Sequence, residues 1–206
     1  MKTKIKLFNF LGAPVNFDLL FLILFAVLPV PFCIGIFLAV LIHEMAHAYV
    51  ADKKGYNVYG IEVSLFHGSA SIDNNIHERD SIPVTAAGPL SNLLLYLISF
   101  GLSLTMENQF ITDFMNINLF LFIFNILPIY PMDGGVILKD FLVLKSRALN
   151  ISRLEANKIS AIVSLIFSIL LVIYSIVSGY LIMGIFAGFF VYQSYMTLEK
   201  MKTGRR

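Results

Sequence analysis

The sequence predicts an all-α integral membrane protein, with about six transmembrane helices and a small β-hairpin or sheet at its cytosolic face. Three observations lead to this fold class: the apolar composition, the division of the chain into apolar runs, and the placement of the basic residues. Of the 206 residues, 58% are hydrophobic and 14% are charged, and the mean hydropathy is +0.81. About a quarter of the residues are charged in an ordinary soluble domain, so this composition excludes that class.

Six apolar runs divide the chain and predict its membrane crossings. At about 20 residues per crossing, a chain of this length has room for about six crossings and little else. Pro29 and Pro31 predict a tight turn between the first two runs. We therefore expect a single membrane domain over residues 1–206, with spans at about residues 17–28, 32–51, 82–104, 110–127, 159–178 and 180–196.

The basic residues all fall on one side of the membrane if the chain crosses six times. The 15 Lys and Arg residues lie before the first run, between the second and third, between the fourth and fifth, and after the sixth. The opposite loops contain none, and the loop after the third run carries Glu107. Because cytosolic loops are enriched in Lys and Arg, we expect both termini and residues 52–81 and 139–158 to lie in the cytosol.

Short alternating segments predict strands at the cytosolic face. Residues 4–8 (KIKLF), 61–65 (IEVSL) and 69–73 (SASID) alternate between polar and apolar side chains, and Gly68 is a turn candidate between the last two. These features predict a small hairpin around residues 61–65 whose free edge could pair with another strand.

The segment LIHEMAHAYV at residues 41–50 places three titratable groups inside an apolar run. His43 and His47 are four positions apart, so on a helix they share a face and can bind one zinc ion. Glu44 could act on the attacking water without being a ligand itself. The alternative is a pair of core histidines, which is costly inside a membrane span, where polar groups are functional candidates. The single cysteine, Cys33, excludes a site built from several cysteines.

A zinc site needs a third protein ligand, and Asp133 is the candidate. It follows Pro128 and Pro131 in the segment NILPIYPMDGG, near the cytosolic end of the fourth run. Gly134 and Gly135 would let the backbone approach closely or leave room for a substrate. The alternative is an aspartate that caps a helix starting near Gly134. The matching depth of the two histidines favours the ligand.

With these motifs, the chain resembles the site-2 proteases, a family of intramembrane zinc metalloproteases. The resemblance is carried by HEMAH, by AAGPLSN at residues 86–92, by NILPIYPMDGG at residues 125–135 and by the start IKLFNFLGAPVNF. It implies one zinc per chain bound by His43, His47 and Asp133, with Glu44 as the catalytic acid and base. It also implies substrates that are transmembrane proteins or peptides, cut within or beside the membrane, and flanking spans that part to admit them.

The chain departs from many members of that family in having room for neither a PDZ nor a CBS domain, so it resembles a minimal form. The loop after the predicted hairpin has Gly68 preceded by His67. His67 could fill the open zinc position as an inhibitory ligand, or it could be an ordinary loop histidine. Asn125 could hydrogen-bond the substrate or the developing oxyanion, or it could serve the backbone interrupted by Pro128.

Two other functions fit parts of the sequence. A metal transporter could place histidines and an aspartate in broken helices, and a catalytically inactive scaffold could retain the fold. The transporter has little need of a glutamate at position 44, and an inactive scaffold would tend to have lost it, so Glu44 favours the protease. The expected partners are the substrate and the lipid bilayer rather than a nucleic acid, and the oligomeric state stays open.

Overall fold

The computed structural model describes residues 4–64 and 68–203. It divides into two compact units, Met1–Ile123 and Phe124–Arg206, with the boundary inside one continuous helix, α3 (Gln109–Ile126). The first unit contains a sheet, a 3-10 helix and most of three long helices, and the second contains the helices that follow.

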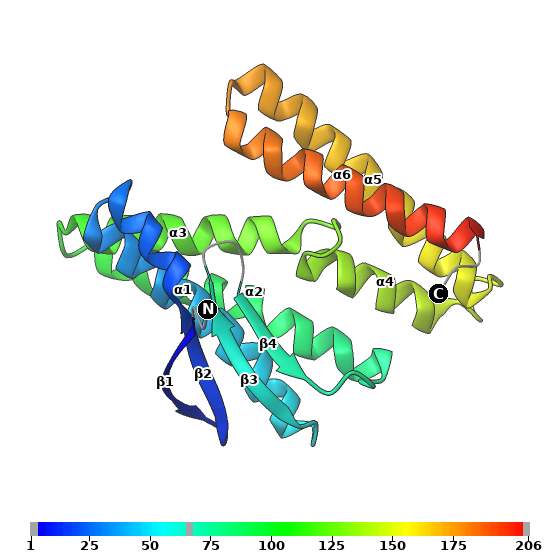
Figure 1. Cartoon of the computed structure of the whole chain (residues 1–206), viewed down its shortest axis with the longest axis horizontal. Coiled ribbons are helices and arrows are strands. Elements are labelled where there is room, and N and C mark those ends of the chain that lie inside the picture. Colours follow the sequence, from blue (N-terminus) through cyan, green and yellow to red (C-terminus); the bar gives the residue numbers. More distant parts are fainter. Residues whose placement is uncertain (1–3, 65–67, 204–206) are drawn as a thin grey trace. The chain divides into compact units, whose positions relative to one another are not determined.

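The sheet of the first unit has four strands in the order β1-β2-β3-β4 (Figure 1). The strands are β1 (Lys4–Phe10), β2 (Ala13–Asp18), β3 (Val58–Val63) and β4 (Gly68–Ile72). β1–β2 and β3–β4 are antiparallel pairs, and β2 pairs with β3 in parallel. The predicted strands are therefore confirmed within the described residues, and β2 is an additional one.

The free edge of the predicted hairpin pairs with another strand, as the sequence analysis expected. Ile61 lies in β3, which has β2 on one side and β4 on the other. The open edges are instead β1 and β4, because each is hydrogen-bonded to one neighbour. Residues 65–67, which include the end of the predicted strand and His67, lie outside the described part of the chain.

The first predicted span, residues 17–28, is wrong as a membrane-length helix. Its start is the end of β2, and the rest is the 3-10 helix η1 (Leu19–Ala26), whose first free N–H groups are capped by Asp18. Part of this run packs within the protein, whereas Leu20, Leu22 and Ile23 are exposed. Phe21 is 1% exposed, and its ring lies 5.9 Å from that of Phe37. A strand followed by a 3-10 helix has the same apolar composition as a short membrane helix, so composition alone could not separate them.

Four described helices are long and apolar enough to cross a membrane. They are α1 (Val30–Lys53), α2 (Glu78–Ser103), α3 and α5 (Arg153–Ser178). These correspond to four of the six predicted spans, and the protein is a multi-pass membrane protein. The last predicted span is also helical, as α6 (Leu181–Thr203), but it is not among these four.

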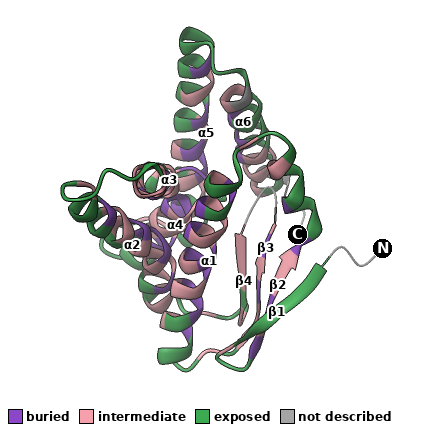
Figure 2. Ribbon diagram, turned by 90° about the vertical axis from the view of Figure 1, so that its left-hand side faces the viewer, coloured by how far each residue is buried: buried purple, intermediate pink, exposed green. Residues whose placement is uncertain are grey.

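Helix α1 is central to the first unit. One side of it packs on β3 and β4, and another packs on α2 (Figure 2). Gly35 allows α3 to come close, because a Cβ at this position would meet the Ile117 side chain. The buried core of this unit lies between α1, η1 and the sheet, and consists of Val15, Phe21, Leu41, Ala48, Ile61 and Val63. Residues in the middle of α1 are therefore enclosed on several sides.

The second unit is a helical hairpin of α5 and α6 with the shorter α4 (Asp133–Lys145) packed on α5. Gly179 ends α5 in the left-handed conformation, with φ of 74°, which favours glycine. Small residues let the two helices approach, and a Cβ at Gly184 would meet the Ser175 hydroxyl. The buried small residues of the pair are Ala156, Ala161, Ser164, Ser168, Ser175, Ala187 and Ser194.

Candidate metal centre and active site

His43 and His47 lie one turn apart on α1, and their side chains converge. Their Nε2 atoms are 3.1 Å apart, and the ring centroids are 4.7 Å apart in an edge-to-face arrangement. His43, Glu44 and His47 are each at most 8% exposed. The structure thus brings together, inside the protein, the two histidines that the spacing predicts on one face.

Helix α2 fixes the outer nitrogen of each ring. The Nδ1 atom of His47 lies 2.8 Å from the carbonyl oxygen of Val84, which can only accept, so this Nδ1 must carry the hydrogen. The Nδ1 atom of His43 lies 2.5 Å from Oδ1 of Asn92, a second acceptor. A neutral imidazole with its hydrogen on Nδ1 has a lone pair on Nε2. The two Nε2 lone pairs therefore face each other, an arrangement that favours a cation between them.

The distance between the two Nε2 atoms is close to that expected for two nitrogen ligands of one zinc ion. Two nitrogen ligands at about 2.05 Å from a tetrahedral zinc ion stand about 3.3 Å apart, close to the observed 3.1 Å. Metal-binding histidines usually donate their other N–H to a carbonyl or carboxylate oxygen, and both rings donate to a carbonyl-type oxygen. The geometry of this pair is that expected of two metal ligands.

Gly88 on α2 gives the two rings their space. A Cβ at this position would meet Nε2 and Cε1 of His47 and Nε2 of His43. Any larger residue would thus occupy the volume in which the two nitrogens converge. The glycine of the AAGPLSN segment therefore has a specific function in the structure, which is to let α2 approach the histidines.

Glu44 lies beside the first residue of the edge strand β4. A Cβ at Gly68 would meet the Glu44 side chain, including its carboxyl group. Glu44 is 7% exposed, so its carboxyl group lies between α1 and the start of β4 rather than in open solvent. A segment aligned on β4 would pass close to this carboxyl group.

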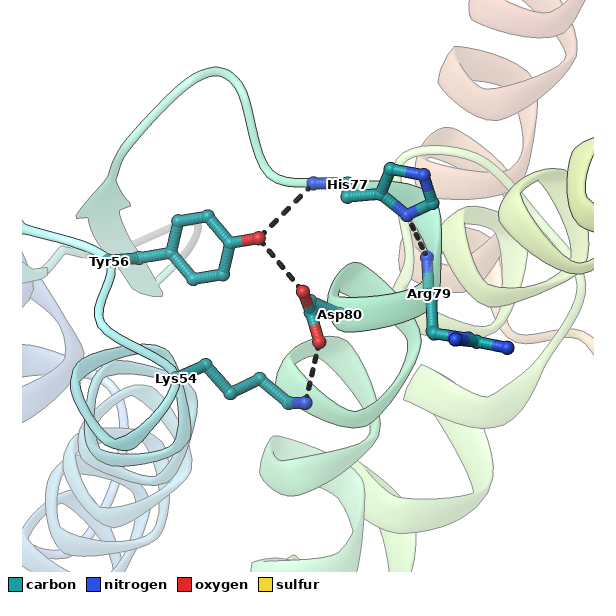
Figure 3. Close-up of polar contacts among 5 residues, drawn as sticks. All are labelled: Lys54, Tyr56, His77, Arg79 and Asp80. Atoms are coloured by element: carbon teal, nitrogen blue, oxygen red, sulfur yellow. Dashed lines mark hydrogen bonds and ion pairs between the residues drawn. The ribbon is translucent and has the colours of Figure 1, made fainter.

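A polar cluster joins the end of α1 to the start of α2 (Figure 3). Lys54 Nζ lies 2.7 Å from one carboxylate oxygen of Asp80, and the Tyr56 hydroxyl donates to the other over 3.0 Å. His77 is exposed, and its Nδ1 caps α2 by accepting from the backbone N–H of Arg79. These contacts fix the position of α2 along α1, and α2 supplies both partners of the histidine rings.

Asp133 belongs to the second unit, where it is the first residue of α4. Met132 is the N-cap residue of this helix, so the alternative of Asp133 as the cap is not observed. A Cβ at Gly134 or Gly135 would run into the backbone of residues 126–130. Of the two roles considered for this glycine pair, close backbone approach is therefore the one observed.

The segment before Asp133 is tied to the α5–α6 hairpin within the second unit. The backbone N–H of Tyr130 donates to Oγ of Ser164 over 2.9 Å. The same Oγ lies 2.7 Å from Oγ of Ser194 on α6. Both serines are 1% exposed, so the last residues before the candidate ligand have a buried hydrogen-bonded support.

The sequence did not identify the individual roles of Val84, Gly88 and Asn92. An amide inside an apolar run is a signal that could have singled out Asn92. A backbone carbonyl such as that of Val84 carries no sequence signal at all. Asn125 lies in the last turn of α3 and is half-buried, and its role stays a prediction.

Comparisons with known proteins agree with this arrangement. The model of Peptidase family M50 matches residues 105–173, which include Asp133. Zinc metalloprotease MJ0392 from Methanocaldococcus jannaschii is 30% identical over 194 residues, which cover 82% of this chain and 55% of that protein. The putative zinc metalloprotease sll0528 from Synechocystis sp. is 34% identical over 111 residues, covering 51% of this chain and 29% of that protein. The chain thus spans about half the length of the first relative and matches less of the second.

A solved structure shares the fold over nearly the whole chain. The site-2 protease from Methanocaldococcus jannaschii superposes with a TM-score of 0.69 and covers 95% of each chain, at 23% sequence identity. At that identity the match establishes the fold alone. The matched part of the chain is thus similar to Peptidase family M50, the related sequences are named as zinc metalloproteases, and the fold is that of a solved site-2 protease.

Proposed function

We propose that this protein is an intramembrane zinc metalloprotease that cleaves transmembrane segments of membrane proteins. The observation that carries the proposal is the geometry of His43 and His47 on α1. Their Nε2 atoms lie 3.1 Å apart with the lone pairs facing each other, next to the buried Glu44. The relatives named as zinc metalloproteases and the match of residues 105–173 to the model of Peptidase family M50 support the same activity.

The proposed metal site holds one zinc ion per chain. Its ligands are His43, His47 and Asp133, each of which can offer one ligand atom. Two imidazoles and a carboxylate are ligands that zinc commonly takes in catalytic sites, where the fourth position stays open for solvent or substrate. His67 is proposed as an occasional ligand at most.

Glu44 is the proposed acid and base. When bound, zinc polarises the scissile carbonyl and makes water a stronger nucleophile at neutral pH. Glu44 takes the proton of the attacking water while the new C–O bond forms, and delivers it to the nitrogen as the C–N bond breaks. The products are a carboxylic acid and an amine, which become a carboxylate and an ammonium group when the acid proton passes to the amine. Asn125 is proposed to hydrogen-bond the substrate carbonyl as negative charge develops on it.

The substrate must be unwound before it can react, because the peptide bonds of a transmembrane helix are hydrogen-bonded and shielded. We propose that the unwound segment adds to the open edge of β4, which would satisfy its freed N–H and C=O groups. The proximity of Gly68 to Glu44 supports this edge over β1. Substrates with small or helix-breaking residues near the cut would unwind at lower cost.

The proposed orientation has both termini in the cytosol, as the basic residues indicate. In this proposal the sheet lies at the cytosolic face, because β2 pairs with β3, and β3 is part of the cytosolic residues 52–81.

A single substitution separates metal binding from chemistry. Glu44→Gln should keep zinc, because glutamine has nearly the same shape and Glu44 is not a proposed ligand. It should lose cleavage by at least the roughly 10²–10⁴-fold typical of removing a general acid or base, because a neutral amide cannot take up a proton. The measurement is cleavage of a model transmembrane substrate by detergent-purified protein, with zinc quantified in the same samples.

The controls test the ligand set. His47→Ala and Asp133→Ala should each strip the zinc, and His67→Ala should leave it bound. Near-normal cleavage by zinc-loaded Glu44→Gln protein would defeat the proposed mechanism, and full zinc in the Asp133→Ala protein would show that the third ligand is misassigned.

A further inference from the structure

Asn118 on α3 is a fully buried amide. Its Oδ1 accepts a hydrogen bond from Nδ2 of Asn92 over 2.9 Å, and its own Nδ2 donates to the carbonyl oxygen of Phe114 over 2.8 Å. Asn92 is also fully buried, and its Oδ1 accepts from Nδ1 of His43. A chain of hydrogen bonds therefore runs from the backbone of α3 through two amides to a proposed zinc ligand.

The donor and acceptor roles along this series of hydrogen bonds are fixed by the Phe114 carbonyl. The Phe114 carbonyl oxygen can only accept, so the Asn118 amide must present its NH₂ group there and its oxygen to Asn92. Asn92 must then direct its own NH₂ group at Asn118 and its oxygen at His43. The carbonyl oxygen of Ala39 faces the same NH₂ group, but at the longer distance of 3.4 Å. Each amide has one orientation that satisfies all its neighbours.

We propose that Asn118 is a positioning residue for the metal centre. It holds the Asn92 amide so that the oxygen faces His43, and this keeps the hydrogen of His43 on Nδ1 and the lone pair on Nε2. The inference rests on the proposed function, in which His43 is a zinc ligand through Nε2. It gives α3 a part in zinc binding through a residue that lies outside the His-Glu-x-x-His motif and the Asp133 segment.

Without the Asn118 oxygen, the Asn92 amide would no longer be held with its own oxygen facing His43. The Asn92 amide could then turn its NH₂ group towards Nδ1 of His43. That nitrogen would have to accept, and the ring hydrogen would move to Nε2, where it would block metal binding. Partners in the outer shell of a metal ligand typically contribute about 10–100-fold to metal affinity.

The test is the zinc affinity of the full-length protein in detergent, measured by competition with a chromophoric chelator. Asn118→Leu has the same branching at Cγ but no acceptor, and it should weaken zinc binding by about 10–100-fold. Asn118→Asp keeps an accepting oxygen in the same place, and it should retain most of the wild-type affinity. Asn116→Leu, at an exposed position on the same helix, is the matched control and should bind zinc normally.

A second readout reports on the ligand itself. The visible spectrum of the Co²⁺-loaded protein should change in Asn118→Leu and resemble wild type in Asn118→Asp, because only the leucine frees His43 to change tautomer. If the leucine variant does not fold, Asn118→Ala asks the same question without added bulk.

The outcomes separate this inference from the proposed function. Wild-type zinc affinity in Asn118→Leu or Asn118→Ala would overturn the positioning role, and so would an Asn118→Asp variant as weak as Asn118→Leu. Failure of the wild-type protein to bind zinc, or equal binding by His47→Ala, would instead overturn the proposed metal site.

Discussion

Two glycines, Gly88 and Gly68, give the functional side chains of the candidate site the space that they occupy. Gly88 faces the converging nitrogens of the histidines, and Gly68 faces the carboxyl group of Glu44. Each added methyl group would therefore press on one part of the site and leave the other part alone. The two positions can separate metal binding from chemistry without changing any proposed ligand or the proposed acid and base.

We expect Gly88→Ala to lose zinc and Gly68→Ala to keep it. At position 88 the methyl group would push the rings away from their hydrogen bonds to α2, which hold Nε2 in place. At position 68 it would displace only the Glu44 side chain, and misplacing a reacting group by about 1 Å can cost about 10²-fold in rate. Zinc content and cleavage rate, measured on the same samples, check both expectations.

Gly101→Ala is the matched control for these substitutions. Gly101 lies on α2 like Gly88, and a Cβ there meets nothing within 4 Å. It should keep both zinc and cleavage. Full zinc binding by Gly88→Ala would contradict the steric role assigned to that glycine, and undiminished cleavage by Gly68→Ala would contradict the position proposed for Glu44.

The sequence predicts the residues of the site better than it predicts their surroundings. The spacing of His43 and His47 places them on one helix face, because a helix repeats every 3.6 residues. The hydrogen bonds that orient the rings come from Val84 and Asn92, some forty to fifty positions later in the chain. Such contacts depend on how α2 packs against α1, which no local pattern specifies.

Among the secondary-structure elements, the β3–β4 hairpin is the one that meets both Glu44 and the open sheet edge. Its ends are tied by Asp73, which accepts hydrogen bonds from the Tyr59 hydroxyl over 2.6 Å and the Asn57 backbone N–H over 2.7 Å. The Tyr59 hydrogen bond, followed by that of Asn57, holds the pKa of Asp73 below its usual value. Asp73, which follows β4, is thereby linked to the start of β3.

We expect an unwound substrate to cross-link to β4 and not to β1. A photoreactive residue at Ser71, exposed on β4, would sit beside an added strand, whereas one at Leu7 would lie on the opposite edge of the sheet. Glu44→Gln protein should be used, because it should hold substrate without cutting it. The measurement is the yield of cross-linked substrate from each position.

Equal cross-linking from both edges would indicate non-specific contact with the apolar substrate. Cross-linking from Leu7 alone would mean that the substrate adds to β1, far from Glu44 in the order of strands, and would remove the proposed role of β4.

Over the whole molecule, apolar composition alone does not distinguish a membrane helix from a strand followed by a 3-10 helix. The apolar segments that form α1, α2, α3 and α5 are long enough to be predicted as membrane helices. Residues 17–28 are also apolar, but they form the end of β2 and the 3-10 helix η1, from which Phe21 packs against Phe37 of α1. The boundary between the two compact units also has no sequence signal, since it falls inside the continuous helix α3.

Orientation in the membrane is a property of the whole chain, and two exposed loop positions test it. Asn108 lies between α2 and α3, and Asn74 lies between β4 and α2. The proposed orientation places Asn108 outside the cell and Asn74 in the cytosol, because basic residues flank only Asn74.

In a Cys33→Ala background, a membrane-impermeant thiol reagent added to intact cells should label a cysteine at position 108 and not one at position 74. Both should be labelled after the membrane is permeabilised, which shows that each cysteine can react. Since Asn74 and Asn108 lie at opposite ends of α2, the reverse pattern would invert the orientation, and labelling of both in intact cells would mean that α2 does not cross the membrane.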